Sequence, residues 1–187
     1  MLPRVLSVPE IAAIVRESAV ETEVFVFGGL CVMEEGRCSL SSYATGQSPN
    51  MNGVCSPASH VAYAEREGQI VSTLGGFTIN SFGKDEPAGY PTLCKGRFTT
   101  PKSSGYIFEE PVSLDAAAML PALREAGVTA LKIEGRQRGR AYIAGVVRSF
   151  RGILAALDEG RRAPAPGLAA MAEGQASTVG AYRKGWR

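Results

Sequence analysis

Hydrophobic residues near the N-terminus first recur at helical spacing and then form one continuous apolar run. Apolar positions repeat every three or four residues from residue 8 to residue 18, which predicts a helix with one hydrophobic face. Ser7 and Glu10 stand at the spacing of a capping box, which predicts where this helix begins. The apolar run from Glu23 to Phe27 predicts a buried β-strand.

Helical periodicity returns in the C-terminal part of the chain. Ser113 is predicted to be an N-cap and Gly127 the glycine that ends the helix. Pro121 must either kink this segment or start a second helix within it. Residues 128–133 are then predicted to form a strand, and residues 140–157 a helix with a regular apolar face.

The central region has a different pattern, in which short apolar or alternating runs are separated by turn residues. Two such runs, residues 60–64 and 69–74, flank a polar turn and predict a β-hairpin. Strand followed by helix predicts parallel strands joined by crossover helices, and therefore an α/β fold. Only two core strands are evident. We divide the chain, as one partial domain, into a helix and strand (1–38), a cysteine-bearing insert of loops and hairpins (39–112), a helix–strand–helix unit (113–160) and a surface tail (161–187).

Composition adds limits on size and partners. The 187 residues are enough for one domain with a core, and 45% hydrophobic with 20% charged residues is ordinary for a soluble protein. The net charge of +2 is too small to indicate nucleic acid or a membrane surface as a partner. The sequence contains neither a signal peptide nor an apolar run of membrane-spanning length, so we expect a cytoplasmic protein.

The cysteines are the main candidates for chemistry. In a reducing compartment, disulfides are rare and a metal site gains weight. Each cysteine stands beside glycine, proline or small polar residues, where turns can direct thiolates and backbone N–H groups toward one point. A metal site is therefore favoured, with structural cysteines and disulfides as alternatives, and zinc and an iron–sulfur cluster fit equally well. The four candidate ligands are Cys31, Cys38, Cys55 and Cys94.

Nucleophilic catalysis has little support in the sequence. A cysteine or serine nucleophile normally requires a histidine base, and His60 is the only histidine. It opens a predicted hairpin strand, where a partly exposed structural role is expected. The chain also lacks the H-E-x-x-H motif of zinc peptidases, so no catalytic residue can be named.

A basic segment follows the second predicted core strand. Ligands bind at this end of parallel strands in α/β folds, and arginine is suited to carboxylates. The alternative is a solvated strand–helix junction with ordinary ion pairs. The candidate anion-binding residues are Lys132, Glu134, Arg136 and Arg138, with Arg140 as a further positive charge. Nearby aromatic residues are expected to pack rather than to stack on bases: Tyr90, Phe98 and Tyr142.

Four motifs resemble those of peptidase family U32, a collagenase-like family. They are EVFVFGGLCVMEEGRCSLSS, TGQSPNMNGVCSP, AGYPTLCKGRF and LKIEGRQRGRAYIAGVVR, which together span residues 23–148. Within the family they look most like the UbiU-like branch of oxygen-independent ubiquinone biosynthesis. The resemblance implies that Cys31, Cys38, Cys55 and Cys94 hold a 4Fe-4S cluster.

The resemblance also implies a function and a partner. A UbiU-like protein would work as a heterodimer with a UbiV-like subunit to hydroxylate a ubiquinone precursor without oxygen, with prephenate as the hydroxyl donor. Because prephenate is a dicarboxylate, the basic segment could bind it. A tRNA uridine hydroxylation protein of the same family, or a non-catalytic cluster-bearing subunit, is the alternative. Peptidase activity has no support in the residues.

The resemblance also implies a fold. Family members carry a further N-terminal segment that supplies the first half of a TIM-like barrel. We therefore expect this chain to be N-terminally truncated and to contain the C-terminal half of such a barrel, interrupted by the cysteine-bearing insert.

Overall fold

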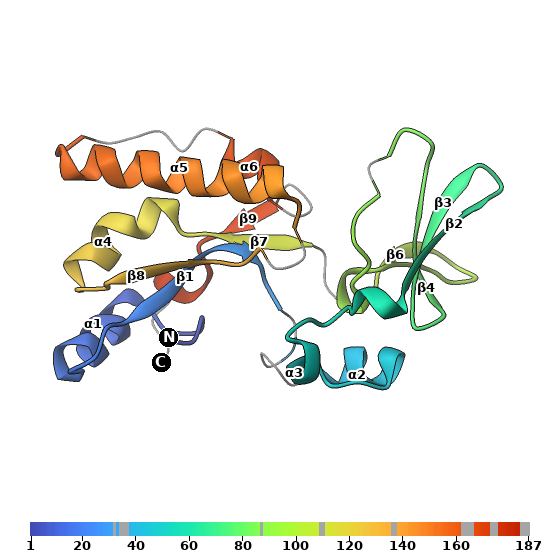
Figure 1. The fold of residues 1–187 in the computed structure, drawn as a ribbon, viewed down its shortest axis with the longest axis horizontal. Helices are drawn as coiled ribbons and strands as arrows, with labels where there is room; N and C mark the ends of the chain where they lie inside the picture. The colour runs from blue at the N-terminus through green and yellow to red at the C-terminus, as the bar shows by residue number, and fades with distance from the viewer. Residues whose placement is uncertain are drawn as a thin grey trace. The chain divides into compact units, whose positions relative to one another are not determined.

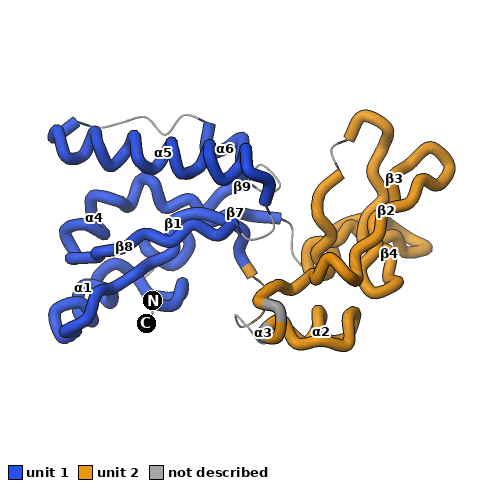
Figure 2. The backbone as a smooth tube through the Cα atoms, viewed as in Figure 1, with its two compact units in different colours: residues 1–30, 111–187 blue, residues 31–110 orange. Residues whose placement is uncertain are grey.

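The computed structural model divides the chain into two compact units. Residues 1–30 and 111–187 form unit 1, and residues 31–110 form unit 2 (Figure 2). Within them the structure describes residues 1–31, 33, 38–86, 88–108, 111–135, 138–161, 167–172 and 176–183. In this part of the chain, no helix is both long and apolar enough to cross a membrane.

Unit 1 is built on a mixed four-stranded sheet (Figure 1). Its strands, in spatial order, are β8 (Ala130–Ile133), β1 (Glu23–Gly29), β7 (Val112–Asp115) and β9 (Ala176–Thr178). β1 is parallel to β8 and antiparallel to β7, and β7 is parallel to β9. The α/β class is confirmed. The half-barrel is not confirmed by this sheet, because all strands of a TIM barrel run parallel.

The helices of unit 1 follow the predicted periodicity closely. α1 (Val8–Glu17) begins at the predicted capping box, where the Ser7 backbone N–H and hydroxyl both donate to the Glu10 carboxylate at 2.7 Å. α5 (Arg140–Asp158) covers the sheet in Figure 1 and buries Val146, Phe150 and Ile153 of the expected apolar face, whereas Ile143 and Val147 of that face are exposed. The shorter helices are α4 (Leu120–Glu125), α6 (Leu168–Met171), and the 3₁₀ turns η3 (Ala117–Met119) and η5 (Gly180–Arg183).

The predicted N-cap at Ser113 is wrong. Ser113 is buried in β7, where it pairs with Gly29 of β1. The helical segment begins later, with the Asp115 carboxylate accepting a hydrogen bond from the Ala117 backbone N–H at 3.0 Å. Pro121 lies in the first turn of α4, so it starts a helix rather than kinking one. Gly127 follows that helix with a φ of +83°, as predicted.

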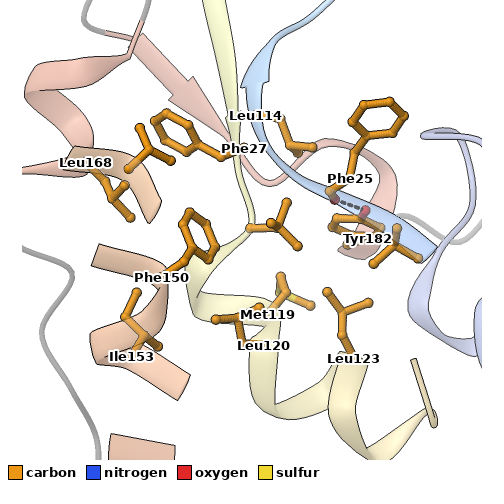
Figure 3. Close-up of a cluster of buried hydrophobic side chains, with 14 of the residues drawn as sticks. Phe25, Phe27, Leu114, Met119, Leu120, Leu123, Phe150, Ile153, Leu168 and Tyr182 are labelled. Carbon is orange, nitrogen blue, oxygen red and sulfur yellow. Dashed lines mark hydrogen bonds between the residues drawn. The ribbon is translucent and has the colours of Figure 1, made fainter. Parts of the chain in front are cut away.

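The core of unit 1 lies between the sheet and the helices. Phe27 of β1 contacts Phe150 of α5 edge to face, with ring centroids 6.0 Å apart. Segments distant in sequence complete the core, since Leu168 of α6 and Tyr182 of η5 are both buried in it (Figure 3). The Tyr182 hydroxyl donates to the Phe25 carbonyl of β1. Residues after position 160 therefore contribute to the interior.

Replacing Tyr182 with phenylalanine should lower the free energy of unfolding of unit 1 by about 1–2 kcal/mol at neutral pH. The buried Phe25 carbonyl would lose its hydrogen-bond donor. Burial raises the pKa of Tyr182 from 10.0 to about 12, so its stabilising contribution is complete below pH 10 and is lost as the pH rises through about 12. Urea unfolding of both proteins across this range should show a steeper alkaline loss in the wild type. Parallel curves would contradict this.

Unit 2 contains a three-stranded antiparallel sheet and a two-stranded hairpin. The sheet comprises β2 (Val61–Arg66), β3 (Gln69–Leu74) and β4 (Phe77–Phe82), and the predicted hairpin is its first half. The hairpin pairs β5 (Arg97–Thr99) with β6 (Ser104–Tyr106). The helical segments are α2 (Ser39–Thr45), α3 (Pro49–Asn52), η1 (Ala58–His60) and η2 (Leu93–Lys95).

Candidate functional site

All four cysteines belong to unit 2, and each lies in a loop, at the start of a short helix or within a 3₁₀ turn. Cys31 is exposed and follows β1. Cys38 is the N-cap of α2, Cys55 lies between α3 and η1, and Cys94 is buried within η2. None of the four forms a disulfide, and the turn context predicted from the sequence is confirmed.

Ser41 connects the Cys38 and Cys55 segments. Its backbone N–H donates to the Cys38 sulfur at 3.3 Å, because Cys38 occupies the N-cap position of α2. Its hydroxyl donates to the Cys55 carbonyl. Ser41 is only 3% exposed, so both bonds lie inside unit 2. Ser41 is not among the residues predicted from the sequence, although a polar residue three positions after an N-cap is a recognisable signal.

Tyr90 connects the Cys55 and Cys94 segments. Its hydroxyl donates to the Ser56 carbonyl at 2.8 Å, directly after Cys55. Pro91 is fully buried, which fixes the chain between Tyr90 and η2. A structural role for Tyr90 was expected, but no sequence pattern identified its partner.

A small hydrophobic core holds the elements that carry Cys38 and Cys94. Ala44 of α2 packs with Leu74 and Ile79 of the sheet, and Leu93 of η2 packs against the same cluster. Gly75, in the β3–β4 turn, approaches α2 so closely that a Cβ on it would lie 1.7 Å from the Ala44 carbonyl oxygen. The sheet therefore sets the position of the helix that Cys38 caps.

The thiols influence one another electrostatically. Burial raises the pKa of Cys94 to about 12, with the positive charge of Lys95 opposing this shift and the other three thiols adding to it. Burial also raises the pKa of Cys55; the Ser56 side chain opposes this, and Cys38 and Cys31 add to it. The four thiols are therefore close enough for charge on one to affect the pKa of another. A bound cation would favour their deprotonation.

The donor set suits a thiolate-ligated metal group, although the side chains are not closed around one point. Within the described ranges, no three His, Cys, Asp or Glu side chains are arranged to hold a metal ion. A backbone N–H already reaches the Cys38 sulfur, and the buried Lys95 supplies positive charge beside Cys94. Both features stabilise negatively charged sulfur. His60 instead places its Nδ1 atom 3.0 Å from the Ser59 hydroxyl.

The predicted anion-binding residues that the structure describes lie in unit 1, either in β8 or shortly after it: Lys132, Glu134 and Arg138. Lys132 forms an ion pair with Glu23 at 3.5 Å and lies over the Phe25 ring. The Glu134 backbone N–H donates to the Phe27 carbonyl oxygen. The Glu134 side chain lies against Gly28, and a Cβ added to Gly28 would be 2.5 Å from the Cβ of Glu134.

The other positive charges of the basic segment come from Arg136, Arg138 and Arg140. The Arg138 guanidinium lies 5.5 Å from the Tyr142 ring centroid, and the exposed Arg140 begins α5. Arg136 lies outside the described residues. As expected, Tyr142 packs on Phe27. Anion binding by this segment remains a prediction.

The sequence profile of peptidase family U32 matches residues 1–186, which include both units and all four cysteines. The chain belongs to peptidase family U32. The family assignment made from the cysteine motifs is therefore confirmed. No solved structure matches the chain significantly.

Characterised relatives of this U32 chain are named for RNA hydroxylation. It is 31% identical to tRNA hydroxylation protein P of Haemophilus influenzae, with 81% of this chain and 37% of the relative covered. It is 29% identical to the 23S rRNA 5-hydroxycytidine C2501 synthase of Escherichia coli, with 86% of this chain and 20% of the relative covered. It is 25% identical to tRNA hydroxylation protein P1 of Bacillus subtilis, with 82% of this chain and 31% of the relative covered. The chain spans at most 37% of each of these proteins.

Proposed function

We propose that this U32 chain is part of a protein that hydroxylates a base in tRNA. The observation that carries the proposal is the similarity to tRNA and rRNA hydroxylation proteins over more than four fifths of the chain. The sequence motifs favour a ubiquinone precursor over tRNA, whereas the RNA-hydroxylating relatives support the opposite order. These relatives also weigh against the inference from net charge that nucleic acid is not a partner.

We further propose that Cys31, Cys38, Cys55 and Cys94 hold a 4Fe-4S cluster. The support is the thiolate donor set, the backbone N–H at the Cys38 sulfur and the positive charge of Lys95. When bound, such a cluster supplies one-electron redox chemistry. The residues of this chain would hold it in unit 2 and offset its negative charge.

The other parts of the proposal concern substrate and assembly. Lys132, Glu134, Arg136 and Arg138 are proposed to bind a carboxylate-bearing hydroxyl donor such as prephenate, because this basic stretch of sequence includes and follows β8, which is parallel to β1. We also propose that the parallel pair β1–β8, with its helices, belongs to a TIM-like barrel in the family's longer proteins. The motif resemblance keeps a ubiquinone precursor, with a UbiV-like partner subunit, as the second candidate function.

Deleting the gene for this chain in its host separates the two substrates. Digested tRNA is analysed by mass spectrometry for hydroxylated nucleosides, and the quinone pool is measured from the same anaerobic cultures. Loss of a hydroxylated tRNA nucleoside with normal quinone supports the tRNA proposal. Normal tRNA with loss of ubiquinone would replace it with the second candidate, and normal levels of both would reject both.

An exposed aromatic pair in unit 2 offers a specific test of RNA binding. Tyr43 of α2 is 78% exposed, Phe77 of β4 is 44% exposed, and their ring centroids are 5.6 Å apart. Stacking a base on such a ring contributes about 1–3 kcal/mol. Tyr43→Ala should therefore weaken the binding of a fluorescein-labelled single-stranded RNA by about 5- to 150-fold in anisotropy titrations. Tyr106→Ala, which removes an exposed tyrosine from β6, is the matched control. Equal binding by both variants would remove the aromatic pair from the RNA interface.

A further inference from the structure

Three of the four cysteine-bearing segments are joined by hydrogen bonds from side chains that are not themselves predicted ligands. Ser41 joins the segments of Cys38 and Cys55, and Tyr90 joins the Cys55 segment to the one that leads into Cys94. These hydrogen bonds fix the three segments relative to one another.

Ser41 uses each of its polar groups in this arrangement. The N–H donates to the Cys38 sulfur, the hydroxyl donates to the Cys55 carbonyl, and the carbonyl accepts a hydrogen bond from the Thr45 hydroxyl at 2.8 Å. The last bond fastens Ser41 to the turn of α2 that follows. Because Ser41 is 3% exposed, water cannot easily replace a bond that is lost.

Tyr90 acts on the other side of Cys55. Its hydroxyl bonds to the backbone of Ser56, whose side chain is fully buried, and its chain neighbour Pro91 is also fully buried. The buried residues Ser56 and Pro91 thus lie near the two ends of the segment that connects Cys55 to Cys94. Cys31, by contrast, is exposed.

We propose that Ser41 and Tyr90 are positioning residues that join the Cys38, Cys55 and Cys94 segments to one another around a metal group, with the exposed Cys31 as the fourth ligand. This inference rests on the proposed 4Fe-4S cluster. Residues that orient metal ligands in this way typically change metal affinity 10- to 100-fold when they are replaced.

The test uses the full chain, reconstituted anaerobically with iron and sulfide. Ser41→Ala and Tyr90→Phe each remove one hydroxyl, and Ser41→Thr keeps a hydroxyl at position 41. Ser39→Ala, at an exposed serine of the same helix, and Tyr106→Phe, at an exposed tyrosine, are the matched controls. Circular dichroism and thermal unfolding establish that each variant is folded.

The readouts are the rate of iron loss to a chelator and the electron paramagnetic resonance spectrum of the reduced protein. We expect Ser41→Ala and Tyr90→Phe to lose iron about 10- to 100-fold faster than the controls, with altered spectra, and Ser41→Thr to behave like the wild type. Folded variants that match the controls in both readouts would overturn the positioning roles while leaving the cluster proposal intact. A wild-type chain that takes up no iron would instead overturn the cluster proposal, and the positioning roles with it.

Discussion

Replacing Cys94 with serine should reduce the iron content of the anaerobically reconstituted chain from about four atoms to less than about one. Cys94 is the most buried of the four cysteines, and it lies in η2, which packs against the small core of unit 2. A serine hydroxyl is a poor ligand for iron, and a buried position leaves little room for water to substitute. The broad visible absorption of a cluster should disappear together with the bound iron and sulfide.

The controls for Cys94→Ser separate ligand loss from unfolding. The hydroxyl is nearly isosteric with the thiol, so far-ultraviolet circular dichroism should be unchanged, and the surface variant Ser39→Ala should retain the full iron content. Full iron in Cys94→Ser would remove Cys94 from the ligand set. Colourless wild-type protein with stoichiometric zinc would replace the proposed cluster with a zinc site.

Elements with strong local signals were predicted well from the sequence. The capping box of Ser7 and Glu10 placed the start of α1, because both partners lie within one turn. The hairpin of β2 and β3 was equally local, since its turn is short and its strands are neighbours in sequence. The apolar period of α5 located that helix within about one residue at each end.

The strands β7 and β9, which depend on distant partners, were not predicted, whereas the apolar runs of β1 and β8 identified those two strands. Val112–Asp115 becomes a strand because it pairs with β1, far earlier in the chain, and this pairing overrides the local N-cap signal of Ser113. β9 pairs in turn with β7. The interior role of Tyr182 depends on a carbonyl in β1, and composition alone suggested a surface segment.

The site shows the same division between local and distant information. Turn residues beside each cysteine indicated loops, and the structure has the four thiols in loops or short helical segments of one unit. The bonds of Ser41 and Tyr90 cross between segments, so the residues next to each cysteine could not reveal them. Likewise, Lys132 meets Glu23 only because β8 lies parallel to β1.

Replacing Gly75 with alanine should destabilise unit 2 by about 2–4 kcal/mol. A Cβ at this position would lie 1.7 Å from the Ala44 carbonyl oxygen, and the φ of +57° is already unfavourable for alanine. The obstacle is backbone rather than a flexible side chain, so either the turn or α2 must move. The Gly75 N–H also donates to the His60 carbonyl at 2.8 Å, which resists movement of the turn.

The neighbouring Gly76 provides the matched control for Gly75→Ala. Its φ is +87°, but no atom lies within 4 Å of the position a Cβ would occupy. Gly76→Ala should therefore show only the backbone strain, about 1 kcal/mol, and the difference between the variants measures the steric contact with α2. Hydrogen exchange of the β3 and β4 amides reports the stability of unit 2 directly.

Because α2 carries Cys38 at its N-cap, Gly75→Ala should also take up less iron than Gly76→Ala. Equal exchange in the two variants would contradict the close packing of this turn against α2, and equal iron uptake despite unequal exchange would separate the cysteine site from the position of that helix.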